Sequence, residues 1–268
     1  MNYTNNISIY KHTVNYCNKE IFPVDDPVKY DYRSIDLTDD VIFGRFGQYD
    51  RPVVVAVLNI DSFDLARQMN RSTQTNNILV LNLASDKNSG GGVIRGANAQ
   101  EEDLYRKSNY FQANDPKFYP LGVTESVYSP LVHIIKDSNY TLLPEPVAVS
   151  CLAVAAINRP KLITLNTNLD SNSDSDSDTN TYANVTDRIL TQKKIDSIFK
   201  IAIVNNHTEL VLGALGCGAF RNPPKEVATM FKKSLRKYGR FFNRIGFAIL
   251  CTNNTINYDT FKAVLSAK

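Results

Sequence analysis

Cysteine and histidine are scarce in this 268-residue chain, which has four cysteines and three histidines. Cys17, Cys151, Cys217 and Cys251 lie far apart, with no CxxC pair and no histidine at a metal-ligand spacing. The sequence therefore predicts neither a zinc site nor a disulfide framework, and we expect no metal ion and no cofactor. Unpaired thiols are typical of a reducing compartment, which favours a cytoplasmic or nuclear location.

Long apolar runs and strong charge of either sign are also missing. No window holds the roughly 18 apolar residues of a membrane span, and the N-terminal MNYTNNISIYKHTVNYC does not resemble a signal peptide, so no membrane association is expected. The net charge is only +3. The one dense basic group, KKSLRK at 232–237, is more typical of a solvated helix face than of a phosphate track. Direct DNA binding is not predicted.

With 43% hydrophobic residues, the chain is long enough for one large domain or one domain with an extension. Residues 1–50 lack a regular pattern and are expected to be an N-terminal extension of short elements packed on a main domain at 51–268. The segment LDSNSDSDSDTNTYAN at 169–184 is rich in Asp and Ser and predicts a solvated loop. Its aspartates lack the glycine and closing glutamate of a calcium loop.

Predicted strands and helices alternate along the main domain. Apolar runs predict buried strands at 53–58, 78–83, 126–135, 210–215 and 245–251. Helices are predicted after Asp61, from Asn98 toward Ser108, over the apolar segment 146–157, across 195–203, from Pro223 and over 258–267. This alternation predicts a three-layer α/β/α fold with a mixed, largely parallel central sheet.

Two glycine-rich loops each follow a predicted strand and precede a predicted helix. The first lies in GGGVIRGANAQEE at 90–102, and the second is GCGAF at 216–220. In this position, backbone amides and a helix N-terminus form a cradle for an anion, which implies a phosphate or diphosphate ligand. Neither loop has the spacing of a P-loop or of a dinucleotide fingerprint, so ATP hydrolysis and hydride transfer are disfavoured.

Glu101 and Glu102 stand at the start of a predicted helix, where two interpretations are open. Asn98 and Glu101 have the spacing of a capping box, which needs no function. Alternatively, one carboxylate faces a ligand while the other orients it. Adjacent helix side chains point about 100° apart, so the two are not the opposed pair of an ordinary glycosidase. A general acid here needs desolvation to raise its pKa.

Other nucleophiles and bases are less promising. No Ser-His-Asp arrangement emerges from the three histidines: His133 is expected to pack in the core, and His207 lies at a helix end. Loop amides would lower the pKa of Cys217, but it has no evident base nearby. We therefore expect Cys217 to have a packing or backbone-contact role.

The segment LNLASDKNSGGGVIRGANAQEEDLYRKS resembles the signature region of the bacterial-type poly(ADP-ribose) glycohydrolases, which are built on a macrodomain. The GGG followed by QEE is the specific part. LGALGCGAFRNPPKEVA is similar to that family's diphosphate loop, and VYSPLVHIIKD and AINRP resemble its intervening segments. The resemblance covers residues 51–260. It implies a macrodomain-like fold, hydrolysis of ribose–ribose O-glycosidic bonds, and a role in reversing ADP-ribosylation, for example in the DNA damage response.

The resemblance also implies roles for individual residues. Glu102 would protonate the departing ribose oxygen and then act as base toward water, Glu101 would hydrogen-bond the substrate ribose, and Gln100 would support the loop. The expected contacts with the distal ribose and phosphates come from Asn88, Gly90, Gly91, Gly92 and Val93. The expected diphosphate amides and a covering ring come from Gly216, Cys217, Gly218, Ala219 and Phe220. The bound diphosphate would stabilise an oxocarbenium-like transition state.

The chain departs from the family pattern at Ser89, where proline is usual, at Leu215, where an aromatic is common, and in the Asp/Ser-rich segment. The expected partners are poly(ADP-ribose) or an ADP-ribosylated protein, with ADP-ribose as product, bound by a monomer. Two alternatives stay open: an enzyme that removes single ADP-ribose units, and a non-catalytic ADP-ribose reader. A structural scaffold would leave both glycine loops unexplained.

Overall fold

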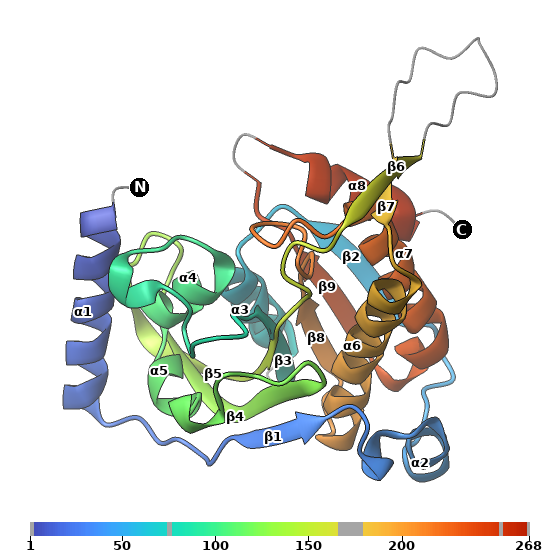
Figure 1. The fold of residues 1–268 in the computed structure, drawn as a ribbon. Coiled ribbons are helices and arrows are strands. Elements are labelled where there is room, and N and C mark those ends of the chain that lie inside the picture. Colours follow the sequence, from blue (N-terminus) through green and yellow to red (C-terminus); the bar gives the residue numbers. More distant parts are fainter. Residues whose placement is uncertain (1–2, 74–76, 166–178, 252–253, 267–268) are drawn as a thin grey trace.

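The computed structural model describes residues 3–73, 77–165, 179–251 and 254–266, which are built around a seven-stranded sheet (Figure 1). Its strands are β1 (Val28–Asp31), β2 (Val54–Leu58), β3 (Ile78–Leu83), β4 (Glu125–Lys136), β5 (Leu142–Val154), β8 (Glu209–Leu212) and β9 (Arg244–Ala248). They lie in the order β1-β4-β5-β3-β8-β9-β2. β5, β3, β8, β9 and β2 are parallel, whereas β4 is antiparallel to β5 and β1. The prediction of a mixed, largely parallel sheet is confirmed.

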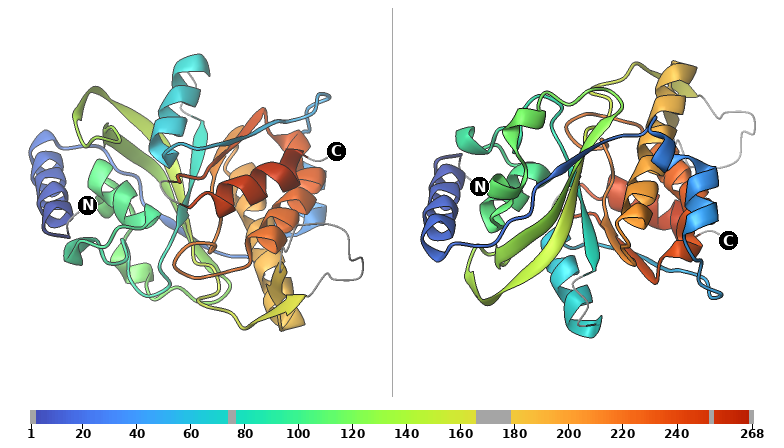
Figure 2. Two further views of the ribbon diagram at one scale, coloured as in Figure 1. Left: turned by 90° about the horizontal axis from the view of Figure 1, so that it is seen from above. Right: turned by 90° about the horizontal axis from the view of Figure 1, so that it is seen from below.

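Helices cover both faces of this sheet (Figure 2). They are α1 (Tyr3–Glu20), α2 (Asp39–Arg45), α3 (Ser62–Thr73), α4 (Gln100–Lys107), α5 (Tyr110–Ala113), α6 (Val185–Val204), α7 (Pro224–Tyr238) and α8 (Ile256–Ser266), with 3-10 helices η1 (Ile35–Leu37), η2 (Val93–Arg95), η3 (Pro116–Phe118) and η4 (Gly239–Phe241). Alternate residues of β3 face opposite layers: Leu79 and Leu81 join the core under α6 and α7, and Ile78 and Val80 join the core under α3, α4 and α5. The structure therefore has the predicted three-layer architecture.

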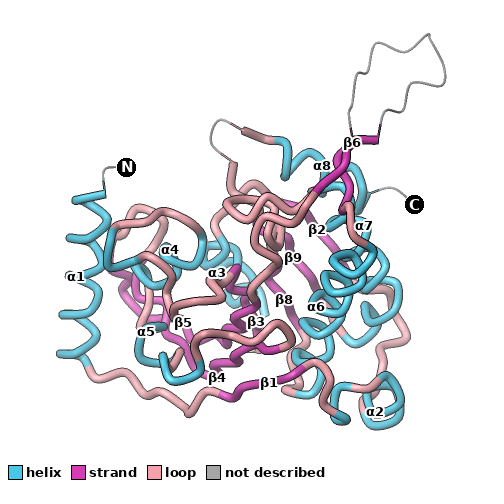
Figure 3. The backbone as a smooth tube through the Cα atoms, viewed as in Figure 1, coloured by secondary structure: helices cyan, strands magenta, loops and turns pink. Residues whose placement is uncertain are grey.

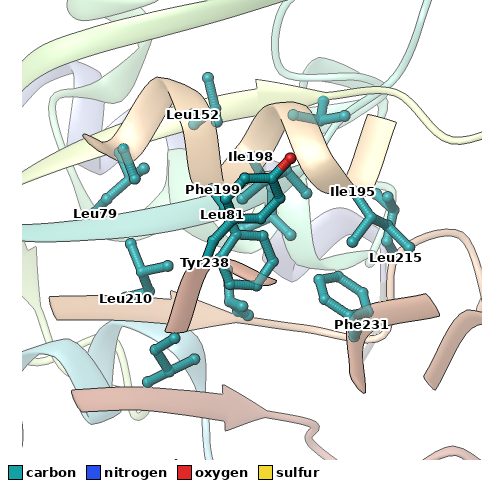
Figure 4. Close-up of a cluster of buried hydrophobic side chains, with 14 of the residues drawn as sticks. Leu79, Leu81, Leu152, Ile195, Ile198, Phe199, Leu210, Leu215, Phe231 and Tyr238 are labelled. Carbon is teal, nitrogen blue, oxygen red and sulfur yellow. The ribbon is translucent and has the colours of Figure 1, made fainter. Parts of the chain in front are cut away.

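The larger core lies between the sheet and the layer of α6, α7 and α8. Figure 4 shows leucines from β3, β5 and β8 meeting Ile195, Ile198 and Phe199 of α6 and Phe231 and Tyr238 of α7. The predicted inner face of α6 is confirmed, because the five positions assigned to it are buried; Ile201, outside that face, is buried as well. Burial of each isoleucine or phenylalanine side chain there contributes about 1.5–3 kcal/mol. This core fixes β8 and α7, which flank the second glycine-rich loop.

Residues 3–50 are more regular than predicted. α1 has 18 residues and packs on α4 and η2, and β1 pairs with the free edge of β4. The buried positions of α1 are Asn6, Thr13 and Cys17. They share one helix face, but two of them are polar, so hydrophobic periodicity could not reveal the helix. The domain boundary at residue 50 stays a prediction.

The prediction of a buried helix over 146–157 is wrong. This segment belongs to β5, which pairs with β3 on one side and β4 on the other. A strand buried between two neighbours and covered on both faces is apolar throughout, so its pattern does not differ from that of a buried helix. Residues 53–58 do form a strand, β2, but it is an edge strand with Val54 63% exposed rather than a buried one.

Part of the Asp/Ser-rich segment has regular structure. Residues 179–182 form β7 (Thr179–Tyr182), which pairs antiparallel with β6 (Leu162–Leu165) in a small separate ribbon (Figure 3). Residues 166–178, which include the aspartates of the rejected calcium loop, lie outside the described residues. No helix within the described ranges is long and apolar enough to cross a membrane.

Candidate active site

The two glycine-rich loops leave the same edge of the sheet. β3 ends at Leu83 and leads into the first loop, and the neighbouring parallel strand β8 ends at Leu212 and leads into the second. The two exits nearly touch, because a Cβ at Gly213 would lie 3.4 Å from a methyl group of Leu83. Both loops therefore lie at the carboxyl ends of adjacent strands, the usual place for a ligand crevice in an α/β sheet.

Glu101 is almost completely buried behind the first loop and accepts three hydrogen bonds. Its carboxylate receives Ser85 N at 2.7 Å, Gly90 N at 3.2 Å and Asn82 Nδ2 at 3.2 Å. Burial raises the pKa of Glu101 to about 8, against the opposing effect of these donors. The desolvation that a general acid needs is therefore present at this pair of carboxylates, and it acts on Glu101.

Glu102 ties the glycine-rich part of the loop to the helix start. Its Oε1 accepts from Gly92 N at 2.8 Å and its Oε2 accepts from Ala99 N at 3.0 Å. Ala99, not Asn98, precedes the first turn of α4, so the predicted capping box of Asn98 and Glu101 is wrong by one residue. The Asn98 side chain instead accepts a hydrogen bond from Arg106. The bond from Ala99 N to Glu102 caps the start of α4, and the bond from Gly92 N holds the glycine-rich loop.

The glycines are required because the loop passes directly over the two carboxylates. Gly90 and Gly91 have φ of +75° and +56°, which favours glycine. A Cβ at Gly91 would lie 2.5 Å from Glu102 Oε1 and 3.0 Å from Glu101 Oε2. At Gly90, the same atom would meet the ring of Tyr105 at 2.6 Å. The loop can take this path only without side chains.

Gln100 joins the helix start to the sheet. Its Oε1 accepts from Leu83 N at 2.9 Å, and its Nε2 donates to Leu81 O at 2.8 Å and to Ser62 Oγ at 3.2 Å. These bonds continue the ladder of β3 through a side chain. Gln100 therefore anchors the start of α4 to the end of β3, from which the first loop leaves, and its role in supporting the loop stays a prediction.

The second loop is held together by Asn222, which lies just beyond it and is buried. Its Nδ2 donates to Ile157 O at 2.7 Å, Gly216 O at 3.2 Å and Phe220 O at 3.3 Å, and its Oδ1 accepts from Tyr182 OH at 2.8 Å. Gly216 has φ of +74°, and a Cβ there would lie 2.5 Å from Asn222 Nδ2. The loop thus has a fixed shape, while Gly218 and Ala219 at its tip are exposed.

Residues 11–137 match the family model described as the catalytic domain of the microbial-type poly(ADP-ribose) glycohydrolase (PARG). A structure of PARG from Deinococcus radiodurans in complex with ADP-ribose is similar over 90% of this chain and 94% of that chain, with 28% sequence identity and a TM-score of 0.71. The predicted resemblance is confirmed. In sequence and in structure, this chain is similar to the PARG glycosidases.

Two structures of PARG from Thermomonospora curvata extend the structural likeness. One is similar over 97% of this chain and 99% of that chain, with a TM-score of 0.77, and the other, bound to the inhibitor ADP-HPD, has the same coverage and a TM-score of 0.76. Both are 22% identical in sequence, so they show the shared macrodomain-like fold. No curated protein matches the chain in sequence.

The expected site residues fall into two groups in this PARG-type fold. The first loop and both glutamates form one hydrogen-bonded cluster, with Gln100 bonded to the end of β3 beside it. Gly216, Cys217, Gly218, Ala219 and Phe220 form the second loop at the same sheet edge. Asn88 has an exposed side chain, whereas the Val93 side chain is buried in the core, so only its backbone lies at the loop surface. Phe220 is half-buried beside the larger core.

The structure shows the surroundings of Cys217 in the second loop and of Leu215 just before it. Burial raises the pKa of the Cys217 thiol, contrary to the lowering by loop amides considered from the sequence. A packing role fits this environment better than a nucleophilic one. Leu215, where relatives often carry an aromatic, is buried in the larger core and fits there (Figure 4).

The two histidines near the sheet have aromatic neighbours. His133 is half-buried, with its ring 5.3 Å from that of Phe22, rather than enclosed in the core as expected. His207 follows α6 as predicted and lies 2.9 Å from Tyr128 OH, and burial lowers its pKa to about 4. Among the described residues, no group of three or more His, Cys, Asp or Glu is placed to hold a metal ion.

A cavity of about 530 Å³ opens beside the second loop. Cys217, Gly218 and Arg221 form one wall, and Asn254 and Asn257 at the start of α8 form another. None of its lining residues comes from the first loop. The lining combines the amide side chains of Asn254 and Asn257 with apolar side chains such as Ile256, which suits a ring that carries polar groups.

Sequence reasoning missed the residues that position the site. Asn82 is a fully buried polar residue in the apolar strand ILVLNL, and this contrast was a signal. Tyr105 gave no such signal, although its hydroxyl binds Ser89 Oγ at 2.7 Å and Asn114 Nδ2 at 2.8 Å and so fixes the loop from below. The role of Asn222 depends on Tyr182, which is 40 residues away in the sequence.

Proposed function

We propose that this chain hydrolyses the ribose–ribose O-glycosidic bonds of poly(ADP-ribose) and releases ADP-ribose. The observation that carries the proposal is the contact between the first glycine-rich loop and the Glu101–Glu102 pair, in which Gly91 leaves no room for a Cβ beside either carboxylate. A loop that only binds an anion does not need two buried acids beneath it. The match to a PARG catalytic domain supports the same conclusion.

In the proposed complex, the distal ribose lies over Gly90, Gly91 and Gly92 with Asn88 and the Val93 backbone at its edge. The diphosphate accepts hydrogen bonds from the exposed amides of the second loop, and the Phe220 ring covers it. The cavity beside the second loop then receives the adenosine. This arrangement uses both loops as anion cradles at one sheet edge.

Glu102 is the proposed acid and base because it is the less buried member of the pair, 7% exposed against 2% for Glu101. As the glycosidic bond breaks, Glu102 donates its proton to the departing ribose oxygen, and the electron pair of the bond stays on that oxygen. The nearby diphosphate stabilises the oxocarbenium-like sugar. Glu102 then takes a proton from the attacking water, which restores the acid.

Glu101 orients the distal ribose in this proposal. Burial raises its pKa to about 8, so this carboxyl keeps a proton near neutral pH. A protonated carboxyl group can donate one hydrogen bond and accept others, which suits a group that binds the hydroxyls of a ribose.

The proposal needs no second copy of the chain, because both loops and both glutamates come from one monomer. The four cysteines are free in the structure. Free thiols support a cytoplasmic or nuclear enzyme that acts on poly(ADP-ribose) or on ADP-ribosylated proteins.

The test is to give the wild-type protein three ligands: poly(ADP-ribose), a protein carrying single ADP-ribose units, and free ADP-ribose. We expect ADP-ribose to be released from the polymer, and free ADP-ribose to bind as a product inhibitor. Release from the mono-modified protein alone would indicate a mono-ADP-ribosyl hydrolase. Binding of all three ligands without any release would indicate a reader and contradict the proposal.

A further inference from the structure

The short helix η2, which follows the three glycines, carries two exposed side chains that the proposed reaction does not use. Ile94 is 68% exposed, and Arg95 is exposed as well. The guanidinium of Arg95 forms no hydrogen bond or ion pair with another residue that the structure describes. A cation without a partner beside an apolar side chain suits a ligand that combines phosphates with a flat ring.

Arg95 lies close to Glu102, on the same side of the loop backbone. A Cβ at Gly92 would lie 3.6 Å from Arg95 Nη2 and 3.6 Å from Glu102 Oε1. That carboxylate oxygen also accepts the hydrogen bond from Gly92 N. The turn is closed by Arg95 N, which donates to Gly92 O at 2.9 Å. The guanidinium is therefore next to the proposed acid without being paired to it.

η2 lies on the side of β3 that faces away from the second loop. It packs against α1 and α4, and Val93 belongs to the core under α3, α4 and α5. The second loop follows β8, the neighbour of β3 in the sheet. Figures 1 and 2 show α1 and α4 together on one side of β3, and β8 with β9 on the other.

The start of α1 adds an aromatic residue to this surface. Tyr3 is 67% exposed, and its carbonyl oxygen would lie 2.5 Å from a Cβ at Gly96. Asn6, three residues further along the same helix face, donates to Gly96 O. Tyr3, Ile94 and Arg95 thus lie around one turn of the chain, and we call them the η2 surface.

The chemistry of the substrate determines which part of the polymer meets this surface. The distal ribose of an ADP-ribose unit carries its diphosphate on C5 and the scissile bond on C1, so these two groups point away from each other. In the proposed complex the diphosphate lies at the second loop. The oxygen that departs at Glu102 therefore leads the rest of the chain away from that loop. The departing ribose carries an adenine and a diphosphate of its own.

We propose that the η2 surface binds the departing unit of the polymer, with Arg95 on its diphosphate and the apolar surface of Tyr3 and Ile94 against its adenine. This inference rests on the proposed function, because it concerns the second product of the same cleavage. A chain of two units then binds more tightly than ADP-ribose, and Arg95 accounts for much of the difference.

The test compares Arg95→Ala with Arg236→Ala, which removes an exposed arginine of α7. Hydrolysis is measured with two substrates that share the reacting unit: a chain of two ADP-ribose units, and an ADP-ribose with an aryl leaving group on the same anomeric carbon. Affinities for the two-unit chain and for free ADP-ribose are measured in a Glu102→Gln background. Thermal unfolding checks that both variants fold.

We expect Arg95→Ala to lower kcat/KM for the two-unit chain, and its affinity, about tenfold relative to Arg236→Ala, as one charge-assisted contact is lost. Hydrolysis of the aryl substrate and binding of ADP-ribose should be the same in both variants. Equal losses with both substrates would place Arg95 at the reacting unit and overturn the inference.

Equal results for the two variants with the two-unit chain would also overturn the inference, while leaving the proposed hydrolysis intact. Conversely, a wild-type protein that cleaved neither substrate would contradict the proposed function. The affinities in the Glu102→Gln background would then still decide whether Arg95 binds a second unit.

Discussion

Gly91 lies directly against the carboxylate of Glu102: a Cβ at Gly91 would stand 2.5 Å from Glu102 Oε1, where no methyl group fits. Gly91 also has φ of +56°, which an alanine tolerates poorly. Gly91→Ala should therefore displace the carboxylate and the loop together. Because a displacement of about 1 Å can cost about 100-fold in rate, we expect a loss of that size in kcat/KM for polymer hydrolysis.

The control for this variant is Gly47→Ala, at an exposed glycine with open space around the added methyl group. It should have nearly wild-type activity. A thermal unfolding curve separates lost activity from lost structure, since backbone strain at Gly91 costs on the order of 1–3 kcal/mol. Full activity of folded Gly91→Ala would show that the contact with Glu102 does not matter for catalysis.

Glu101 should make stability depend on pH. Its pKa rises from the ordinary 4.5 to about 8 in the folded protein. Between these values the folded chain holds a proton that the unfolded chain has lost. The contribution of this carboxyl is therefore fully present below pH 4.5 and is lost as pH rises toward 8, by up to about 1.4 kcal/mol per pH unit.

Glu101→Gln cannot titrate, so the wild-type protein should lose unfolding free energy relative to this variant across that window. Denaturant unfolding at several pH values measures the difference, with Glu145→Gln as the matched change at an exposed position. Parallel curves for the wild type and Glu101→Gln would contradict a buried, protonated Glu101.

The N-terminal helix should support the first glycine-rich loop. Asn6 of α1 is buried and donates through Nδ2 to Gly96 O at 3.0 Å, at the turn between the three glycines and the glutamates. Asn6→Ala leaves that carbonyl buried without its donor, which costs about 1–3 kcal/mol. We expect reduced stability and about tenfold slower turnover, since loss of roughly 1.4 kcal/mol of positioning lowers a rate tenfold.

Asn5→Ala provides the comparison, because the neighbouring asparagine is exposed on the same helix. It should match the wild type in melting temperature and in turnover. If Asn6→Ala behaved like Asn5→Ala in both measurements, α1 would have no part in holding the loop.

The sheet edge that carries the candidate site was largely predictable from the sequence, because its signals are local. The glycines, the glutamates and the strand before them lie within 25 residues, 78–102, and the requirement for glycine there reflects close backbone approach. The three layers were predicted correctly from the alternation of strands and helices, which is also read from short stretches of sequence. Both kinds of signal depend on residues that are neighbours in the sequence.

The errors arose where tertiary contacts decide the structure. The segment 146–157 became a strand because β3 and β4 flank it, which an apolar run cannot reveal. The residue that caps α4 is Ala99 and not Asn98, because Glu102 accepts a hydrogen bond from the Ala99 amide and Arg106 binds the Asn98 side chain. α1 escaped prediction because its buried face includes Asn6 and Thr13, whose partners lie about 90 residues away.

The most direct test of the account is the release of ADP-ribose from poly(ADP-ribose) by the wild type and by Glu102→Gln at equal concentration. Gln at this position keeps the size of the side chain and an acceptor for Gly92 N, but it cannot give or take the proton. The account predicts that release is abolished while ADP-ribose binding changes by less than about tenfold, or about 1.4 kcal/mol. Polymer turnover retained in Glu102→Gln would contradict the assignment of Glu102 as the catalytic acid.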